Sequence, residues 1–468
     1  MPESKYPLVI IGGGPAGYTA AIRAAQLGIK TALVEKQSKL GGTCLNVGCI
    51  PSKALLTSSE HYYNAKYKME AHGVVIKDLS LDISAMMQRK NQAVETLAKG
   101  LNFLMRKNGV DVIHGTAHLV GTNNVFVKTE TENFTIGAEC IILAAGSVPQ
   151  ELTFLKSDGA RVLTSDDALS LENVPQSMMV IGAGAVGLEL GSVWSRLGAK
   201  VTFVEMLPAI AAGMDKEIAS GLQTSLTTQG MEFHLSATVQ SAEVKDHCVA
   251  LKIATANGEL DWEAEKVLVA AGRRPYTDEL FLEEAEIHCD EKGFIEVNEH
   301  WQTKVPTIYA IGDLIRGPML AHRAMEEGVA LVERLAGKAG MVNEALLPRI
   351  VYTAPEAAAV GITEEIAHER GYQYRIGKSS FSHNGRAVAS GLTKGFVKLI
   401  ADAQTDRLIG AHILGAEASE LIAECIMLME FGGSVEDLAR SMHAHPTLNE
   451  AIKEAAWSIH PRLGGHAE

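Results

Sequence analysis

The stretch PLVIIGGGPAGYTAAIRAAQLGIKTALVEK, residues 7–36, has the pattern of a strand, a glycine turn, an amphipathic helix and a second strand. Gly12, Gly14 and Gly17 have the G-x-G-x-x-G spacing, and Glu35 ends the second strand 18 positions after the third glycine. The first glycine permits the tight bend, the second admits a pyrophosphate to the backbone, and the third lets the helix pack against the strand. The acid can accept hydrogen bonds from a ribose. The stretch therefore predicts a dinucleotide-binding unit.

The same pattern returns in MMVIGAGAVGLELGSVWSRLGAKVTFVEM, residues 178–206. Gly182, Gly184 and Gly187 repeat the spacing, and Glu205 again lies 18 positions after the last glycine. One such motif would be weak evidence, because glycine turns also occur for purely structural reasons. Two of them, each between a strand and a helix and each with its acid, predict an α/β protein with two Rossmann-like dinucleotide-binding domains.

The residues around the second acid indicate which dinucleotide binds there. Glu205 is followed by Met206 and Leu207, without an arginine that could accommodate a 2'-phosphate. The carboxylate should repel that phosphate, so the second site is predicted to bind NAD rather than NADP. Two sites in one chain suggest one resident redox cofactor and one that exchanges.

Composition argues against several classes of partner. The 468 residues carry 42 basic and 56 acidic side chains, a net charge of −14, which disfavours binding to nucleic acid or anionic lipid. The N-terminal MPESKYPLVIIGGG lacks a signal-peptide pattern. The most apolar later stretch, residues 178–194, contains Glu189 and falls short of the roughly 20 residues of a membrane span. We expect a cytoplasmic protein with neither a nucleic-acid nor a membrane partner.

Two of the six cysteines lie close together, Cys44 and Cys49 in GGTCLNVGCIPSKALL, residues 41–56. Pro51 suits the first turn of a helix, which places Cys49 at a helix N-terminus where a thiolate is stabilised. A zinc site would need a second ligand pair, and a purely structural disulfide is unusual in a reducing compartment. A redox-active dithiol is the favoured interpretation, and we expect no metal. The other cysteines are scattered singly and are expected to be small apolar side chains: Cys140, Cys248, Cys289 and Cys425.

Together with the two glycine units and GGTCLNVGCIPSK, the segments TIYAIGD (307–313) and HAHPTLNE (443–450) resemble the disulfide reductase family, which contains dihydrolipoyl dehydrogenase, glutathione reductase and mercuric reductase. The resemblance runs from residue 6 to about 460. It implies four domains and a homodimer. The expected domains are an FAD-binding domain (1–149), an NAD-binding domain (150–275), a central domain that completes the FAD site (276–347) and a C-terminal α+β interface domain that pairs two subunits (348–468).

The resemblance also implies the cofactor contacts. FAD is expected to bind tightly but without a covalent bond. Asp313 would hydrogen-bond its ribityl chain, the backbone near Ala321 would lie close to the flavin, and the backbone of Gly115 would contact the adenosine. Lys53 would lie beside the flavin with Glu189 as its ion partner. The backbone near two further residues would contact NAD: Val239 and Gly272.

His445 and Glu450 form the last predicted constellation. His445 precedes a predicted helix whose first turn contains Glu450. A lone histidine there is more often structural, but thiol transfer needs a base that titrates near neutral pH, and a carboxylate is its usual partner. With the resemblance, His445 is expected to be the base and Glu450 to orient it. His443 matches no catalytic position, and the family often has serine where Asn449 stands.

Within the family, GGTCLNVGCIPSKALL and FSHNGRA (381–387) look most like dihydrolipoyl dehydrogenases. Mercuric reductase would need a C-terminal cysteine pair, and glutathione reductase would want basic residues after Glu205 for NADP. The expected reaction is oxidation of protein-bound dihydrolipoamide through Cys44 and Cys49 to FAD and then to NAD. The expected partners are lipoyl domains of acyltransferases or of glycine-cleavage carrier proteins. The alternatives are an NAD(P)H oxidase or transhydrogenase without thiol chemistry, and a noncatalytic scaffold.

Overall fold

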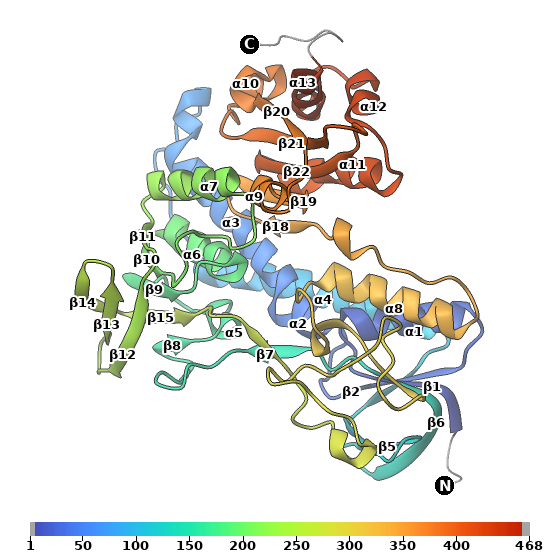
Figure 1. The fold of residues 1–468 in the computed structure, drawn as a ribbon. Helices are drawn as coiled ribbons and strands as arrows, with labels where there is room; N and C mark the ends of the chain where they lie inside the picture. Colours follow the sequence, from blue (N-terminus) through green and yellow to red (C-terminus); the bar gives the residue numbers. More distant parts are fainter. Residues whose placement is uncertain (1–4, 461–468) are drawn as a thin grey trace. The chain divides into compact units, whose positions relative to one another are not determined.

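The computed structural model describes residues 5–460 and has the predicted mixed α/β fold (Figure 1). It divides into two compact units. The first contains the chain up to Leu55 together with Asp82–Gln150 and Ala271–Val342. The second contains Leu56–Leu81, Glu151–Ala270 and the chain from Asn343 onward. The division into four domains stays a prediction.

The first unit is built on a seven-stranded sheet in the order β3-β2-β1-β6-β5-β4, with β17 also paired to β6. Strands β3, β2, β1, β6 and β17 run parallel, whereas β4 and β5 add antiparallel pairs. The residues Leu8–Ile11 are buried, as expected for a central parallel strand covered on both faces. The strands are β1 (Lys5–Ile11), β2 (Thr31–Glu35), β3 (Asp111–His114), β4 (Thr116–Val120), β5 (Asn124–Lys128), β6 (Asn133–Leu143) and β17 (Ile308–Ala310).

The helices of the first unit cover this sheet and carry the cysteines. Helices α1 and α8 pack side by side through small residues such as Ala16, Ala20 and Gly328 (Figure 1). The helices that lie in this unit or begin in it are α1 (Pro15–Gln26), α2 (Gly42–Val47), α3 (Cys49–Tyr67), α4 (Ile83–Asn108) and α8 (Ala321–Leu335).

One short antiparallel pair in the first unit joins two distant parts of the sequence. Strand β7 (Ser147–Pro149) pairs with β16 (Arg273–Pro275), with Pro149 opposite Arg273. The chain passes into the second unit after β7 and returns just before β16.

The second unit repeats the strand–helix–strand arrangement of the first. Strand β9, helix α6 and strand β10 correspond to β1, α1 and β2, in a five-stranded parallel sheet of order β11-β10-β9-β15-β8. A three-stranded antiparallel sheet, β12-β13-β14, lies in the same unit. These elements are β8 (Val162–Leu163), α5 (Ser165–Ala168), β9 (Ser177–Ile181), α6 (Ala185–Leu197), β10 (Lys200–Val204), α7 (Lys216–Thr228), β11 (Glu232–His234), β12 (Thr238–Val244), β13 (Val249–Thr255), β14 (Gly258–Ala264) and β15 (Lys266–Val269).

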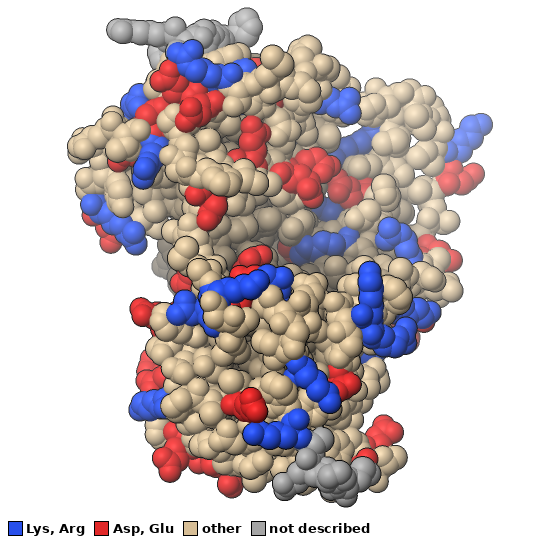
Figure 2. Space-filling view, turned by 90° about the vertical axis from the view of Figure 1, so that its right-hand side faces the viewer, with Lys and Arg blue, Asp and Glu red and all other residues tan. Residues whose placement is uncertain are grey.

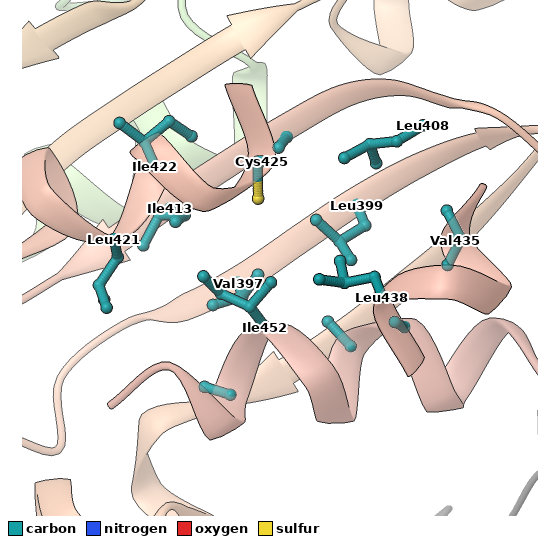
Figure 3. Packing of buried hydrophobic residues seen from close by; sticks show 14 of the residues in the cluster. Val397, Leu399, Leu408, Ile413, Leu421, Ile422, Cys425, Val435, Leu438 and Ile452 are labelled. Atoms are coloured by element: carbon teal, nitrogen blue, oxygen red, sulfur yellow. The ribbon is translucent and has the colours of Figure 1, made fainter. Parts of the chain in front are cut away.

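The C-terminal part of the second unit has a five-stranded antiparallel sheet of order β18-β19-β22-β21-β20. Its helices α11 and α13 contribute Cys425 and Ile452 to one buried apolar cluster (Figure 3). Burial raises the pKa of the Cys425 thiol, in keeping with an apolar role. The elements are β18 (Arg349–Val351), β19 (Glu356–Gly361), α9 (Glu364–Glu369), β20 (Tyr374–Ser380), α10 (Gly385–Ser390), β21 (Phe396–Asp402), β22 (Leu408–Gly415), α11 (Ala418–Glu430), α12 (Val435–Arg440) and α13 (Glu450–Ile459).

The surface carries both signs of charge. On the face drawn in Figure 2, acidic and basic side chains lie scattered among uncharged residues. Among residues 5–460, no helix is both long enough and apolar enough to span a bilayer.

Candidate redox site and cofactor turns

The first glycine turn has the contacts that its spacing predicts. Gly12 has a φ of +108°, and a Cβ there would lie 2.3 Å from the carbonyl oxygen of Ala144. A Cβ on Gly17 would lie 1.8 Å from the carbonyl oxygen of Gly12, so α1 packs directly on the turn. The position of a Cβ on Gly14 is more open, with the Cα of Gly42 at 3.7 Å. The turn thus leaves room at the N-terminus of α1, where N–H groups can bind a pyrophosphate.

The acid at the end of β2 is fixed beside this turn. The carboxylate of Glu35 accepts the backbone N–H of Gly13 at 2.7 Å and that of Gln37 at 2.7 Å. The backbone N–H of Gly115 donates to the carbonyl oxygen of Glu35 at 2.9 Å. The two residues predicted to contact the adenosine half of FAD are therefore neighbours.

The second turn repeats the first. Gly182 has a φ of +102°, and a Cβ on Gly187 would lie 2.2 Å from its carbonyl oxygen. A Cβ on Gly184 would meet no atom within 4 Å. As in the first turn, the third glycine permits close packing and the second borders open space.

The second acid, Glu205, is held in the same way. Its carboxylate accepts the backbone N–H of Ala183 at 2.7 Å and that of Leu207 at 2.8 Å. Val239 packs in one apolar cluster with Val204, the residue before the acid. These contacts place Glu205, the glycine turn and Val239 in one part of the second unit.

The cysteine loop is attached to the first glycine turn. The backbone N–H of Gly41 donates to the carbonyl oxygen of Gly13 at 2.8 Å. Gly42 has a φ of +56°, and a Cβ there would lie 2.6 Å from the Cα of Gly14. Gly41 and Gly42 therefore allow the cysteine loop to lie against the first glycine turn.

The two cysteines lie on successive helices. Cys44 is in α2, and Cys49 is the first residue of α3, as the sequence predicts. The hydrogen bond with Cys49, burial and the charge of Cys49 together raise the pKa of the Cys44 thiol, against the opposing effect of Lys53. The Cys44 thiol therefore loses its proton less readily beside Cys49.

A largely apolar cavity of about 570 Å³ lies beside Cys44. Tyr18 and residues of α4 such as Leu97, Leu101 and Leu104 contribute to its lining. Burial, followed by the charges of Cys44 and Cys49, raises the pKa of Tyr18 to about 12, so its hydroxyl stays protonated. An uncharged substrate arm could therefore reach the sulfur of Cys44 through this cavity.

Hydrogen bonds through Ser147 link Asp313 to the strand pair β7-β16. Ser147 Oγ donates to Asp313 Oδ2 at 2.5 Å and accepts from Arg273 Nε at 2.7 Å. Arg273 Nη2 also donates to the carbonyl oxygen of Ser147 at 2.7 Å. Sequence reasoning missed Ser147 and Arg273 as site residues. The sequence signal that could have found them is that each follows an apolar strand in a similar segment, AAGS after β6 and AGRR after β15.

His445 and Glu450 form the predicted pair. His445 Nδ1 lies 2.9 Å from Glu450 Oε1, and the backbone N–H of Thr447 donates to Glu450 Oε2 at 2.9 Å. Burial alone would raise the pKa of Glu450, but these hydrogen bonds and the charges of His445 and His443 lower it. The ionised carboxylate orients the imidazole and leaves Nε2 for proton transfer. Helix α13 begins at Glu450, directly after a turn at residues 448–449, so Glu450 lies in its first turn as predicted.

The chain matches the pyridine nucleotide-disulphide oxidoreductase family over residues 6–328, and the dimerisation domain of that family over residues 347–456. The chain belongs to the pyridine nucleotide-disulphide oxidoreductases. It is therefore an enzyme, its two dinucleotides are FAD and NAD, and the dimerisation domain indicates a homodimer.

Several relatives within this family are similar over nearly their whole length. The chain is 48% identical to a mitochondrial dihydrolipoyl dehydrogenase of Dictyostelium discoideum, covering 97% of this chain and 94% of the relative. It is 47% identical to the mitochondrial dihydrolipoyl dehydrogenase of Pisum sativum, covering 97% and 91%. It is 42% identical to the dihydrolipoyl dehydrogenase of Cupriavidus necator, covering 98% and 99%.

Solved structures of oxidoreductases have the same fold. An HOCl-induced flavoprotein disulfide reductase of Escherichia coli superposes with a TM-score of 0.87 at 27% identity, covering 97% of this chain and 100% of that one. LpdA of Mycobacterium tuberculosis superposes with a TM-score of 0.90 at 24% identity, covering 99% and 100%. The second similarity, at this identity, concerns the fold alone.

The remaining predicted contacts of this oxidoreductase are distributed between the two units. Lys53 belongs to the first unit and Glu189 to the second, where its Oε1 accepts the backbone N–H of Tyr352 at 3.1 Å. Gly272 lies in the first unit with a φ of +115°, and its carbonyl oxygen accepts the N–H of Gln150 at 3.0 Å. The Lys53–Glu189 ion pair and the NAD contact of Gly272 stay predictions. Ala321 is the first residue of α8, which follows Asp313.

The open positions of the two glycine turns fit two dinucleotide cofactors. Each glycine turn has an open position where a Cβ would intrude on a bound pyrophosphate, at Gly14 and at Gly184. Among the described residues, no group of three or more His, Cys, Asp and Glu side chains could hold a metal ion.

Proposed function

We propose that this chain is a dihydrolipoyl dehydrogenase, which oxidises protein-bound dihydrolipoamide to lipoamide and reduces NAD+ to NADH. The observation that carries the proposal is the Cys44–Cys49 pair, which is attached to the FAD turn through Gly41 and Gly13 and opens on an apolar cavity. The 42% identity over 98% of this chain to a dihydrolipoyl dehydrogenase of Cupriavidus necator supports it.

In the proposed reaction, His445 Nε2 accepts a proton from one thiol of dihydrolipoamide, and the resulting thiolate attacks Cys44 Sγ of the oxidised enzyme. The Cys44–Cys49 disulfide breaks, and Cys49 leaves as a thiolate. The second substrate thiol then attacks the mixed disulfide and its proton passes to the departing Cys44 sulfur, which releases lipoamide and leaves Cys44 as a thiol. The first proton stays on His445 and is released to solvent as NADH forms. FAD, when bound, supplies the two-electron path from the reduced pair to NAD+.

The roles of the two cysteines follow from their surroundings. Cys44 lines the cavity, so it is the sulfur that a substrate thiolate reaches. Cys49 begins α3, where the helix dipole stabilises its thiolate as a leaving group. Glu450 stabilises the imidazolium that His445 becomes during the reaction. The proposed cofactor contacts are Asp313, Ala321, Gly115 and Lys53 for FAD, with Glu189 as the ion partner of Lys53, and Glu205, Val239 and Gly272 for NAD.

The proposed partners are lipoyl domains of acyltransferases or of glycine-cleavage carrier proteins, and the proposed location is the cytoplasm. An apolar cavity suits an uncharged lipoyl arm better than the charged tripeptide glutathione. The scattered cysteines and a cycling dithiol suit a reducing compartment.

Assays of the purified enzyme with lipoamide, glutathione disulfide and mercuric ion, each with NADH and with NADPH, test the proposal. Lipoamide with NADH should be the one pair turned over rapidly. Efficient reduction of glutathione disulfide or mercuric ion would overturn the substrate assignment. NADH oxidation by dioxygen without any lipoamide activity would favour the oxidase alternative.

A further inference from the structure

The loop that carries His445 is irregular and exposed. It connects α12 to α13, and in a single subunit the side chain of His445 is 76% exposed. An exposed loop residue loses conformational entropy when it is held in one position, so a base on such a loop needs additional support. The contact with Glu450 supports the imidazole only from within the same loop and helix.

A second carboxylate contacts the loop on both sides of His445. Glu424 Oε1 lies 2.7 Å from His443 Nε2, and Glu424 Oε2 accepts from Asn449 Nδ2 at 2.9 Å. His443 precedes the base by two residues, and Asn449 directly precedes Glu450. One side chain therefore holds the segment before the base and the residue that leads into its carboxylate partner.

Both ring nitrogens of His443 lie near hydrogen-bond acceptors. Its Nδ1 lies 3.1 Å from the carbonyl oxygen of Ser441, and its Nε2 faces the carboxylate of Glu424. A carbonyl oxygen and an ionised carboxylate can only accept, so each ring nitrogen has an acceptor when both carry protons. These contacts favour the imidazolium form of His443 beside Glu424, and its side chain is only 7% exposed.

Glu424 is carried by a helix that is packed firmly into the core. It lies in α11, whose residues Leu421, Ile422 and Cys425 are buried in the apolar cluster shown in Figure 3. Ile452 of α13 is buried in the same cluster. Because both helices pack into one core, contacts from α11 to the loop fix the loop relative to α13 and Glu450.

We propose that Glu424 is a positioning residue for the reaction, which acts through His443 and Asn449 to hold His445 and Glu450 in their catalytic arrangement. This role rests on the proposed function of His445 as the base. Where the family often has serine, the longer Asn449 of this chain supplies one of the two contacts.

The test compares Glu424→Ala, Glu424→Gln, Asn449→Ser and the matched control Glu420→Ala, which removes an exposed carboxylate from the same helix. The readout is the rate at which dihydrolipoamide reduces the bound flavin, followed by stopped flow. Glu424→Ala should slow this rate by at least tenfold, Glu424→Gln and Asn449→Ser by less, and Glu420→Ala should leave it unchanged. NADH oxidation by ferricyanide, which bypasses the base, should stay at the wild-type rate in all four holoenzymes.

A double-mutant cycle separates positioning from a general structural effect. In a His445→Gln background, Glu424→Ala should cause little further loss, because there is no base left to position. A full additional loss, or a parallel fall in ferricyanide activity and flavin content, would overturn the proposal. So would wild-type rates in Glu424→Ala.

Failure of the proposed function would look different. A wild-type enzyme whose flavin dihydrolipoamide does not reduce would contradict the dihydrolipoyl dehydrogenase assignment itself. An active wild-type enzyme with an unimpaired Glu424→Ala variant would contradict only the role of Glu424.

Discussion

Glu35 and Glu205 accept the same pair of hydrogen bonds, one from the middle of their glycine turn and one from the residue two positions after the acid. Each carboxylate is thereby fixed before any cofactor binds. In the second turn, which is proposed to bind NAD, a fixed negative charge beside the ribose could not easily move away from a 2'-phosphate.

The first prediction concerns this charge. NADH should be preferred over NADPH by well over tenfold in kcat/KM, which corresponds to more than about 1.4 kcal/mol, because Glu205 repels the 2'-phosphate. Glu205→Ala should lower the ratio of kcat/KM for NADH to kcat/KM for NADPH. Steady-state kinetics with both nucleotides measure it, and equal use of them by the wild-type enzyme would show that Glu205 does not select the nucleotide.

The second prediction separates two glycines of the same turn. Gly187→Ala should destabilise the protein, because the new Cβ would lie 2.2 Å from the carbonyl oxygen of Gly182. Gly184→Ala should leave the thermal midpoint near that of the wild type, because its φ is −79° and a Cβ there meets no atom within 4 Å. It should instead raise the KM for NADH. A normal KM in a stable Gly184→Ala enzyme would contradict the pyrophosphate assignment.

The third prediction concerns the two cysteines. Cys44→Ser should leave Cys49 as a lasting thiolate against oxidised flavin and show a visible charge-transfer band. Cys49→Ser should lack it, because the thiolate proposed to face the flavin is then absent and burial still raises the pKa of the remaining Cys44 thiol. Absorption spectra of the two holoenzymes decide the matter. Bands in the opposite variants would reverse the roles of the two sulfurs.

The fourth prediction concerns pH and the Glu424–His443 pair. The hydrogen bond with Glu424 raises the pKa of His443 against the effect of burial, so its contribution to stability is lost as pH rises through that raised value. Burial would raise the pKa of Glu424, but hydrogen bonds from His443 and Asn449 lower it, so its contribution is lost as pH falls through the lowered value. Both contributions to stability are fully present between about pH 4.3 and 6.5, which are the ordinary pKa values of glutamate and histidine.

Glu424→Gln should therefore lower the thermal midpoint most at about pH 5.5, and the difference from the wild type should shrink at high pH. Thermal unfolding of both holoenzymes at pH 5.5 and at pH 9 in low salt measures it. A difference that stays constant with pH would mean that His443 is neutral in the folded protein.

The fifth prediction concerns the dimer. The resemblance to the disulfide reductase family implies that His445 of one subunit acts on Cys44 and Cys49 of the other, because the C-terminal domain pairs the subunits. Homodimers of Cys49→Ser or of His445→Gln should be nearly inactive. A mixed dimer, purified through two different tags, should recover about half of the wild-type lipoamide activity, because one of its two sites is intact. A mixed dimer that is flavin-loaded but inactive would place His445 in the site of its own subunit.

Sequence reasoning succeeded where the chemistry depends on residues close together in the chain. The glycine turns, Cys49 at the start of α3 and the spacing of His445 and Glu450 are local patterns, and the structure has each of them where it was expected. The roles inferred from the family remain predictions, because they depend on cofactor and partner contacts.

Long-range polar contacts could not be predicted. Asp313 meets Ser147 across 166 positions of sequence, and Arg273 meets Ser147 across 126. No periodicity relates such residues, because the folded sheet and not the chain brings them together. The contact of His443 is of the same kind, since Glu424 approaches it from another helix.

The strand pair β7-β16 suggests how the second glycine unit could have been inserted into the chain during evolution. With Pro149 opposite Arg273, the point where the chain leaves the first unit adjoins the point where it returns. A stretch of any length placed between adjoining ends adds little loop-closure cost and breaks no strand of the host sheet. The second glycine unit could therefore have arisen as a duplicate of the first that was inserted between β7 and β16. It could be exchanged at the same place for a domain with a different nucleotide preference.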